Sequence, residues 1–113
     1  MDNNLSILVV DDELSVRDSL SNWFIEDGYT VDTAEDAKEA LKKIEANHFH
    51  IILIDIKLPG MDGLELNRRI KTINEDTIVI IMTAFASVDS AVQALKDGAY
   101  DYVCKPFDPD AVT

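Results

Sequence analysis

Residues 51–55 read Ile-Ile-Leu-Ile-Asp, four apolar residues closed by a carboxylate. A short run that is rich in β-branched residues and apolar at every position is typical of a strand buried on both faces of a parallel sheet. The runs Ile7–Val10 and Ile78–Met82 predict two more strands of this kind. Residues 30–33 alternate and predict a strand with one wetter face, and residues 102–104 predict a short fifth strand.

Apolar residues at steps of three or four lie between these runs and predict amphipathic helices. The four stripes are Val16, Leu20, Trp23 and Phe24; Ala37, Ala40, Leu41 and Ile44; Leu66, Ile70 and Ile73; and Val88, Val92, Leu95 and Ala99. Asp36, followed three residues later by Glu39, predicts the start of the second helix. The alternation of strands and helices predicts an α/β domain, an open parallel sheet with helices on both faces.

The composition excludes several classes of partner. Among 113 residues, 22 are Asp or Glu and 10 are Lys or Arg, a formal charge of −12. Phosphate and anionic-lipid contacts need clustered basic side chains, so we expect no direct nucleic-acid or membrane binding. Cys104 is the single cysteine, and no apolar run reaches the length of a membrane span. These features fit a cytoplasmic protein.

The end of the chain predicts more protein beyond it. Residues 107–110, Phe-Asp-Pro-Asp, are typical of a helix start, with Asp108 as N-cap and Pro109 in the first turn. A helix of ordinary length needs roughly ten residues beyond Thr113. We therefore expect residues 1–113 to be a single domain, a fragment cut at the start of its fifth helix.

Polar residues close four of the predicted strands, at the edge where open α/β sheets bind their ligands. They are Asp11 and Asp12 after the first strand, Asp55 after the third, Thr83 at the end of the fourth and Lys105 after the fifth. Read singly, Asp12 could cap the first helix, Thr83 could be a satisfied hydroxyl, and Lys105 could extend to water. The functional interpretation depends on all of them meeting at one edge.

Such a constellation predicts metal-assisted phosphoryl chemistry. Three carboxylates within a few ångströms repel one another, and a divalent cation relieves the repulsion. Oxygen ligands without His or Cys favour Mg²⁺ or Mn²⁺ over Zn²⁺. Three carboxylates, Mg²⁺ and Lys105 sum to zero charge, so the pocket can admit a phosphoryl group, which a carboxylate could accept as an aspartyl phosphate.

At these residues the chain resembles the receiver domain of bacterial two-component response regulators, over nearly its whole length. The motifs that carry the resemblance are Val9-Val10-Asp11-Asp12-Glu13, Asp55-Ile56-Lys57-Leu58-Pro59-Gly60-Met61-Asp62-Gly63, Met82-Thr83-Ala84, Gly98-Ala99-Tyr100-Asp101-Tyr102 and Lys105-Pro106-Phe107. The resemblance implies a flavodoxin-like, doubly wound sheet of five parallel strands in the order 2-1-3-4-5.

The resemblance also implies a role for each site residue. Asp55 would be the phosphoacceptor. Asp12 would bind Mg²⁺ directly, Asp11 through water or as support, and the carbonyl of Lys57 would be a further ligand. Thr83 and Lys105 would contact the phosphoryl oxygens. Tyr102 would be the aromatic switch that turns inward as Thr83 moves toward the phosphate.

The implied partners follow from the same resemblance. The phosphate donor would be a phosphohistidine on a sensor histidine kinase, and the fourth helix and fifth strand would form the readout face, through which a homodimer could also assemble. The motif details are most similar to the nitrogen-regulatory class, whose receivers precede a sigma-54-activating ATPase and a helix-turn-helix domain. The domain would catalyse its own phosphotransfer and its own dephosphorylation. We expect the dephosphorylation to be slow, because Phe85, two residues after Thr83, offers no group to position water.

Three other interpretations fit less well. A haloacid-dehalogenase-like phosphatase needs a second Asp two residues after the nucleophile, where this chain has Lys57. A flavodoxin-like electron carrier needs a Ser/Thr/Gly-rich phosphate loop after the first strand, where this chain has Asp11-Asp12-Glu13. A degenerate receiver, acting only as a binding module, is disfavoured because the acidic residues, Thr83 and Lys105 are all present.

Several residues are expected to be structural. His48 and His50 flank the start of the third strand, and surface roles are expected for them. Cys104 is interpreted as a small buried residue, Trp23 as partly buried packing, and Asp62-Gly63 as a turn.

Overall fold

The computed structural model describes residues 5–55, 58, 60–83, 93, 95–99 and 101–104, with Thr83 and residues 101–104 described by backbone alone. The elements are β1 (Ser6–Val10), α1 (Leu14–Glu26), β2 (Thr30–Ala34), α2 (Ala37–Ala46), β3 (Ile51–Asp55), α3 (Gly63–Ile73), β4 (Ile78–Thr83) and β5 (Asp101–Cys104). Residues 93, 95 and 96 have helical backbone. The expected final helix falls in residues 105–113, which lie outside the described residues.

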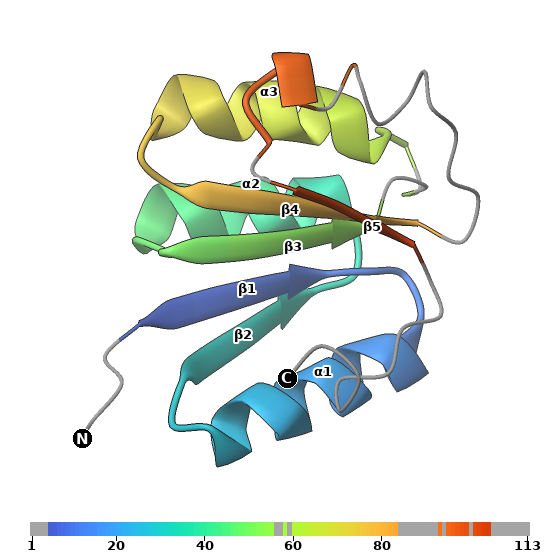
Figure 1. Ribbon diagram of the computed structural model, residues 1–113, viewed down its shortest axis with the longest axis vertical. Helices are drawn as coiled ribbons and strands as arrows, with labels where there is room; N and C mark the ends of the chain where they lie inside the picture. Colours follow the sequence, from blue (N-terminus) through green and yellow to red (C-terminus); the bar gives the residue numbers. More distant parts are fainter. Residues whose placement is uncertain are drawn as a thin grey trace.

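The five strands form one parallel sheet in the order β2-β1-β3-β4-β5, which confirms the predicted doubly wound fold. Because the strands run the same way, their carboxyl ends meet at one edge of the sheet (Figure 1). The register pairs Val10 with Ile54 and Asp55 with Met82. The residues that follow β1 and end β3 are therefore neighbours at this edge.

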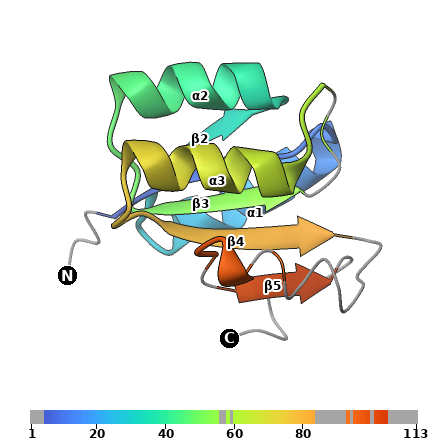
Figure 2. The ribbon, with the colours of Figure 1, turned by 90° about the horizontal axis from the view of Figure 1, so that it is seen from above.

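Two apolar layers hold the helices against the sheet, because alternate residues of each strand point to opposite faces. Leu8, Val10, Ile52 and Ile54 pack with α2 and α3. Ile7, Val9 and Leu53 pack with Leu20 of α1 on the other face. The helices thus cover the sheet on both sides (Figure 2), which explains why residues 7–10, 51–54 and 78–82 of the central strands are all apolar.

The helix starts agree with the sequence in part. Asp36 caps α2, and its carboxylate accepts a hydrogen bond from the Glu39 backbone N at 2.8 Å. Asp62, interpreted as a turn, also caps α3 through the Glu65 backbone N. The N-cap of α1 is Glu13, not Asp12, and its side chain makes no capping hydrogen bond. Asp12 is therefore not needed to start the helix.

The fourth apolar stripe is partly wrong. Ala99 is buried in the core, as expected, but Leu95 is 49% exposed. Asp97 and Gly98 already form a turn, since the Gly98 N donates to the Leu95 carbonyl at 3.1 Å and Gly98 has a φ of +95°. Leu95 thus lies at the end of the helical backbone, where the helical spacing no longer fixes its direction. Ser87, Val88 and Val92 lie outside the described residues.

The edge strand β2 is tied to α2 by an ion pair. Lys43 Nζ lies 2.9 Å from the Asp32 carboxylate and also donates to the Thr33 carbonyl. The same carboxylate oxygen of Asp32 accepts from the Thr33 backbone N at 2.8 Å. One ion pair therefore engages both backbone groups of Thr33.

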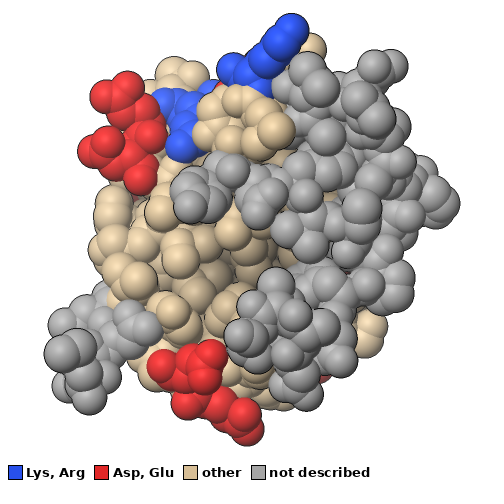
Figure 3. Space-filling model, viewed as in Figure 1, with Lys and Arg blue, Asp and Glu red and all other residues tan. Residues whose placement is uncertain are grey.

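The charged side chains on one broad face of the molecule lie at its margins. Among the residues described on that face, Lys and Arg gather along the upper margin, and acidic side chains form one group beside them and another at the lower margin (Figure 3). The described part of this face thus has basic and acidic groups side by side. It presents no continuous basic surface of the kind that phosphate backbones need.

Candidate functional site

Asp11, the residue that follows β1, is held in place by three hydrogen bonds. The Asp11 backbone N donates to the carbonyl of Ala34 at the end of β2, at 3.1 Å. Its carboxylate accepts from the Glu13 backbone N at 2.9 Å. Its carbonyl accepts from Nη1 of Arg17 in α1, at 2.7 Å. Asp11 is fully buried, so these contacts fix a carboxylate inside the carboxyl edge of the sheet.

Asp55 enters the same edge from β3. It is the last residue of the strand and only 7% exposed. An Asp this buried is rare in a domain core unless it has partners, because removing a carboxylate from water is costly. The neighbouring register of β1 and β3 brings it beside Asp11.

Asp11, Asp12 and Asp55 form one cluster, as the sequence predicts. Each offers a carboxylate oxygen, and these oxygens all lie within 4.8 Å of one another. Asp11 and Asp55 are buried, whereas Asp12 is exposed to solvent. An all-oxygen set of three carboxylates fits a hard divalent cation such as Mg²⁺.

The spacing also suggests how many of these side chains bind such a cation directly. Two oxygens that both lie about 2.1 Å from one Mg²⁺ are at most about 4.2 Å apart. Contact by all three carboxylates would thus need any pair of oxygens that lies farther apart than this to move closer. Contact through water at one of them needs no such movement. The residues present fit the cation in either arrangement.

Of the other predicted site residues, Thr83 and Tyr102 are located by their backbone alone. Thr83 ends β4 and is in register with Cys104 of β5. Tyr102 lies in β5 in register with Ile81. The side chains of both residues, and all of Lys57, Phe85 and Lys105, lie outside the described residues. Their predicted contacts remain predictions.

Arg17 was not recognised from the sequence as part of this site. Its partner is a backbone carbonyl, which no residue pattern reveals. One signal was available, since Arg17 lies near the amino end of α1, where the helix dipole disfavours a cation, and the first turn holds no acidic residue. A side chain that breaks a local rule in this way often serves a site.

At the opposite edge His48 is exposed, as a surface role predicts, whereas His50 is half-buried and hydrogen-bonded. His50 Nδ1 accepts a hydrogen bond from the Ser6 backbone N at 3.0 Å, so the proton of the neutral ring is on Nε2. A ring in that state has no lone pair left for a metal. The His48 ring lies edge-on to the His50 ring, with centroids 4.8 Å apart. Trp23 is half-buried against Phe24, also as expected.

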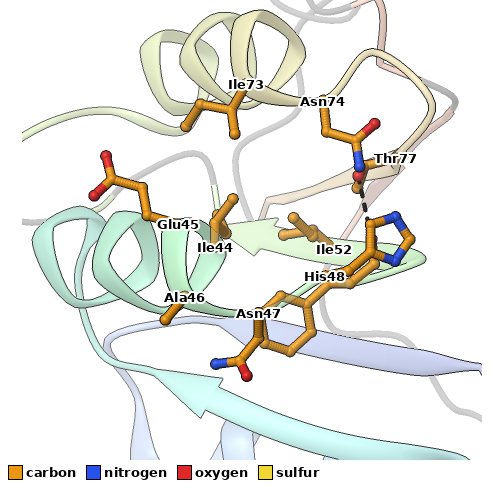
Figure 4. A pocket seen from close by; sticks show the side chains of 10 residues that line it. Ile44, Glu45, Ala46, Asn47, His48, Ile52, Ile73, Asn74 and Thr77 are labelled. Carbon is orange, nitrogen blue, oxygen red and sulfur yellow. Dashed lines mark hydrogen bonds between the residues drawn. The ribbon is translucent and has the colours of Figure 1, made fainter.

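An open pocket of about 320 Å³ lies at this opposite edge, between the ends of α2 and α3 (Figure 4). Ile44, Phe49 and Ile52 are its buried apolar residues. The Thr77 hydroxyl, on its wall, donates to the Phe49 carbonyl at 3.1 Å. None of the three clustered carboxylates lines the pocket, so it is separate from the candidate site.

Comparison with known protein families decides the class of the domain. Residues 7–113 match the response regulator receiver domain. The chain belongs to this family. As a receiver domain it is a phosphoryl-accepting switch of two-component signalling, which confirms the expectation from its motifs.

The relatives of this receiver domain include transcriptional regulators. It is 44% identical over 110 residues to the transcriptional regulatory protein ZraR of Klebsiella oxytoca, covering 94% of this chain and 24% of that protein. It is 38% identical over 109 residues to sporulation initiation phosphotransferase F of Bacillus subtilis, covering 96% of this chain and 88% of that protein. The chain spans about a quarter of the length of the regulators it matches.

Solved structures show the same fold. The beryllofluoride-activated NtrC4 receiver domain dimer superimposes with a TM-score of 0.89 at 43% identity, covering 94% of this chain and 88% of that one. The response regulator TrrA of Thermotoga maritima, solved in complex with Mg²⁺ and a beryllium fluoride, has a TM-score of 0.85 at 37% identity, covering 96% and 92%. Among the described residues of this receiver domain, no helix is long and apolar enough to cross a membrane.

Proposed function

We propose that Asp55 is the phosphoacceptor of this receiver domain and that Asp11, Asp12, Asp55 and the Lys57 carbonyl hold the Mg²⁺ that the reaction requires. One observation carries the proposal: three carboxylates, two of them buried, meet within 4.8 Å at the carboxyl edge of the sheet. In a receiver domain this is a costly arrangement unless a cation joins it. Mn²⁺ is an acceptable substitute for the same ligand set.

In this reaction the receiver domain supplies the nucleophile and the kinase supplies the phosphoryl group. A carboxylate oxygen of Asp55 attacks phosphorus, the P–N bond to the histidine of a sensor histidine kinase breaks, and its electron pair returns to that ring nitrogen. Bound Mg²⁺ would neutralise charge on the phosphoryl oxygens. Thr83 and Lys105 would donate hydrogen bonds to the same oxygens, and Lys105 would complete the charge balance at zero.

The burial of Asp55 serves this chemistry. At the end of a paired strand its backbone is fixed by the β3–β4 register, so the attacking oxygen has little freedom to lose on reaction. Low exposure also limits the access of water to the product, which favours a slow autodephosphorylation. Phe85, which offers no group to orient water, would act in the same direction.

The output follows from population shift. Phosphorylation adds a charge of nearly −2 beside Thr83 and favours the active state of the switch, with Tyr102 turning inward. The face of the fourth helix and β5 would then contact an output domain or a second copy. The beryllofluoride-activated relative is described as a dimer, which supports the homodimer.

The output domain would be a transcription regulator. The chain spans about a quarter of relatives named as transcriptional regulators, which supports residues 1–113 as one receiver domain of a longer cytoplasmic protein. By likeness, a sigma-54-activating ATPase and a helix-turn-helix domain would follow it. The receiver itself, with its acidic composition, would contact neither nucleic acid nor membrane.

Intact-protein mass spectrometry after incubation with acetyl phosphate and Mg²⁺ tests the proposal. We expect a gain of one phosphoryl group, abolished by a chelator and by Asp55→Asn. Asp76→Asn, which removes the same charge at an exposed turn before β4, is the matched control and should react normally. Reaction of Asp55→Asn at the native rate would contradict the assignment. After removal of acetyl phosphate, the phosphoryl group should persist longer on native protein than on Phe85→Glu.

A further inference from the structure

Arg17 has a place in the site that its charge alone does not explain. It lies at the end of the first turn of α1, close to the positive end of the helix dipole, where a cation is disfavoured. It is only partly exposed, and its Nη1 atom donates to the carbonyl of Asp11 at 2.7 Å. The distance is typical of a charge-assisted hydrogen bond, which is stronger than a neutral one.

The position of the Asp11 carbonyl controls the direction of the chain after β1. It belongs to the peptide group that joins Asp11 to Asp12, and this group is planar, so fixing its oxygen fixes the direction in which the chain leaves β1. The other polar groups of Asp11 are held by Ala34 and Glu13. The contact from Arg17 therefore completes the orientation of the segment that carries two of the three clustered carboxylates.

We infer that Arg17 is a positioning residue for the metal site: it holds the Asp11–Asp12 peptide so that both carboxylates face Asp55. The inference rests on the proposed Mg²⁺ site and adds a residue to it that touches neither the metal nor the phosphoryl group. Groups that orient metal ligands in this way commonly change metal affinity by about 10-fold to 100-fold when they are removed.

The sign of the effect distinguishes positioning from simple charge. A guanidinium near three carboxylates repels an incoming cation, so removing only its charge would tighten Mg²⁺ binding. Losing the orientation of Asp11 and Asp12 would weaken binding. A variant without the guanidinium therefore moves the affinity in opposite directions under the two roles.

The experiment is a Mg²⁺ titration of the native chain, Arg17→Met, Arg17→Lys and Arg69→Met, followed by amide NMR shifts at constant ionic strength. We expect Arg17→Met to bind Mg²⁺ roughly 10-fold more weakly. Arg17→Lys, which keeps a charged donor, should recover most of the affinity. Arg69→Met removes a charge from an exposed ion pair on α3 and should bind as the native chain does.

A second measurement needs neither metal nor phosphoryl transfer. The carbonyl carbon of Asp11 in metal-free protein should shift in Arg17→Met, because its hydrogen bond is gone, and less in Arg17→Lys. Unchanged or tighter Mg²⁺ binding by a folded Arg17→Met would overturn the inference while leaving the site intact. If Arg17→Met does not fold, Arg17→Gln takes its place, and unchanged or tighter Mg²⁺ binding by a folded Arg17→Gln whose Asp11 carbonyl shift shows the hydrogen bond lost would overturn the inference. Absence of binding by the native chain would instead overturn the proposed function.

Discussion

At the amino end of the sheet, polar groups meet complementary partners, whereas at the carboxyl end three carboxylates also lie close to one another. The first end joins Ser6, His50 and Ile78 by backbone hydrogen bonds of 2.9 Å, and the His50 ring accepts a further one from Ser6. The second end brings Asp11, Asp12 and Asp55 within 4.8 Å. Both ends belong to the same sheet, so the difference lies in the residues found at each end.

The contrast indicates that the amino end of the sheet contributes to stability and that the carboxyl end carries the groups for chemistry. A buried donor and acceptor that satisfy each other stabilise the native state and need nothing from outside. Like charges brought together at a strand end repel one another, and a bound cation relieves that repulsion. Stability measured with and without Mg²⁺ therefore separates the two ends.

The largest expected effect comes from the strand that joins both ends. Ile52 is fully buried in β3, and Ile52→Ala should lower the free energy of unfolding by about 2–5 kcal/mol through lost burial and the cavity left behind. Urea unfolding measures it. Because the substitution acts on the shared core, the loss should be equal with and without Mg²⁺, and a Mg²⁺-dependent loss would break the comparison.

The next effect belongs to the carboxyl end alone. Mg²⁺ at one hundred times its dissociation constant should raise the unfolding free energy of the native chain by about 2.7 kcal/mol. Asp12→Asn should lose most of this gain, yet without Mg²⁺ it should be more stable than the native chain by about 1 kcal/mol, because one of three like charges is gone.

Urea unfolding of both proteins, at zero and saturating Mg²⁺, checks this reversal. Asp76→Asn serves as the control and should respond to Mg²⁺ as the native chain does. An Asp12→Asn protein that is less stable than the native chain without Mg²⁺ would show that the cluster is not repulsive.

The smallest expected change in unfolding free energy tests the hydrogen bonds at the amino end of the sheet. His50→Ala removes the acceptor of the Ser6 backbone N–H and should lower the unfolding free energy by about 1 kcal/mol, independently of Mg²⁺. His48→Ala, at an exposed neighbour, should change it by less than about 0.5 kcal/mol. Equal losses for the two variants would mean that the His50 hydrogen bond contributes nothing measurable.

The sequence predicts the fold well because its signals are local and strong. The runs in β1, β3 and β4 are apolar on both faces, and only a parallel sheet covered on both sides buries them. The meeting of Asp11 and Asp55 follows from the same logic, since parallel strands end at one edge. The strand order, in contrast, came from the family resemblance.

Other features could not be predicted because they depend on backbone atoms. Arg17 contacts a backbone carbonyl. Glu13 rather than Asp12 is the N-cap of α1, and this depends on the path of the backbone after β1. The exposure of Leu95 depends on a helix that ends before its stripe is complete. Periodicity describes side chains within an element and is silent about its ends.

The ion pair of Lys43 and Asp32 has a consequence for how the protein behaves in a crowded solution. β2 is an edge strand, and because Thr30 and Ala34 bond to the β1 side, Thr33 turns its backbone groups outward. An outward N–H and carbonyl are a template on which a strand of another molecule can add. Burial lowers the pKa of the Lys43 ammonium, but the hydrogen bond and charge of Asp32 outweigh it and raise that pKa above its usual range. The lysine thus stays charged at physiological pH, and a charged side chain at an edge strand disfavours pairing with a strand of another molecule.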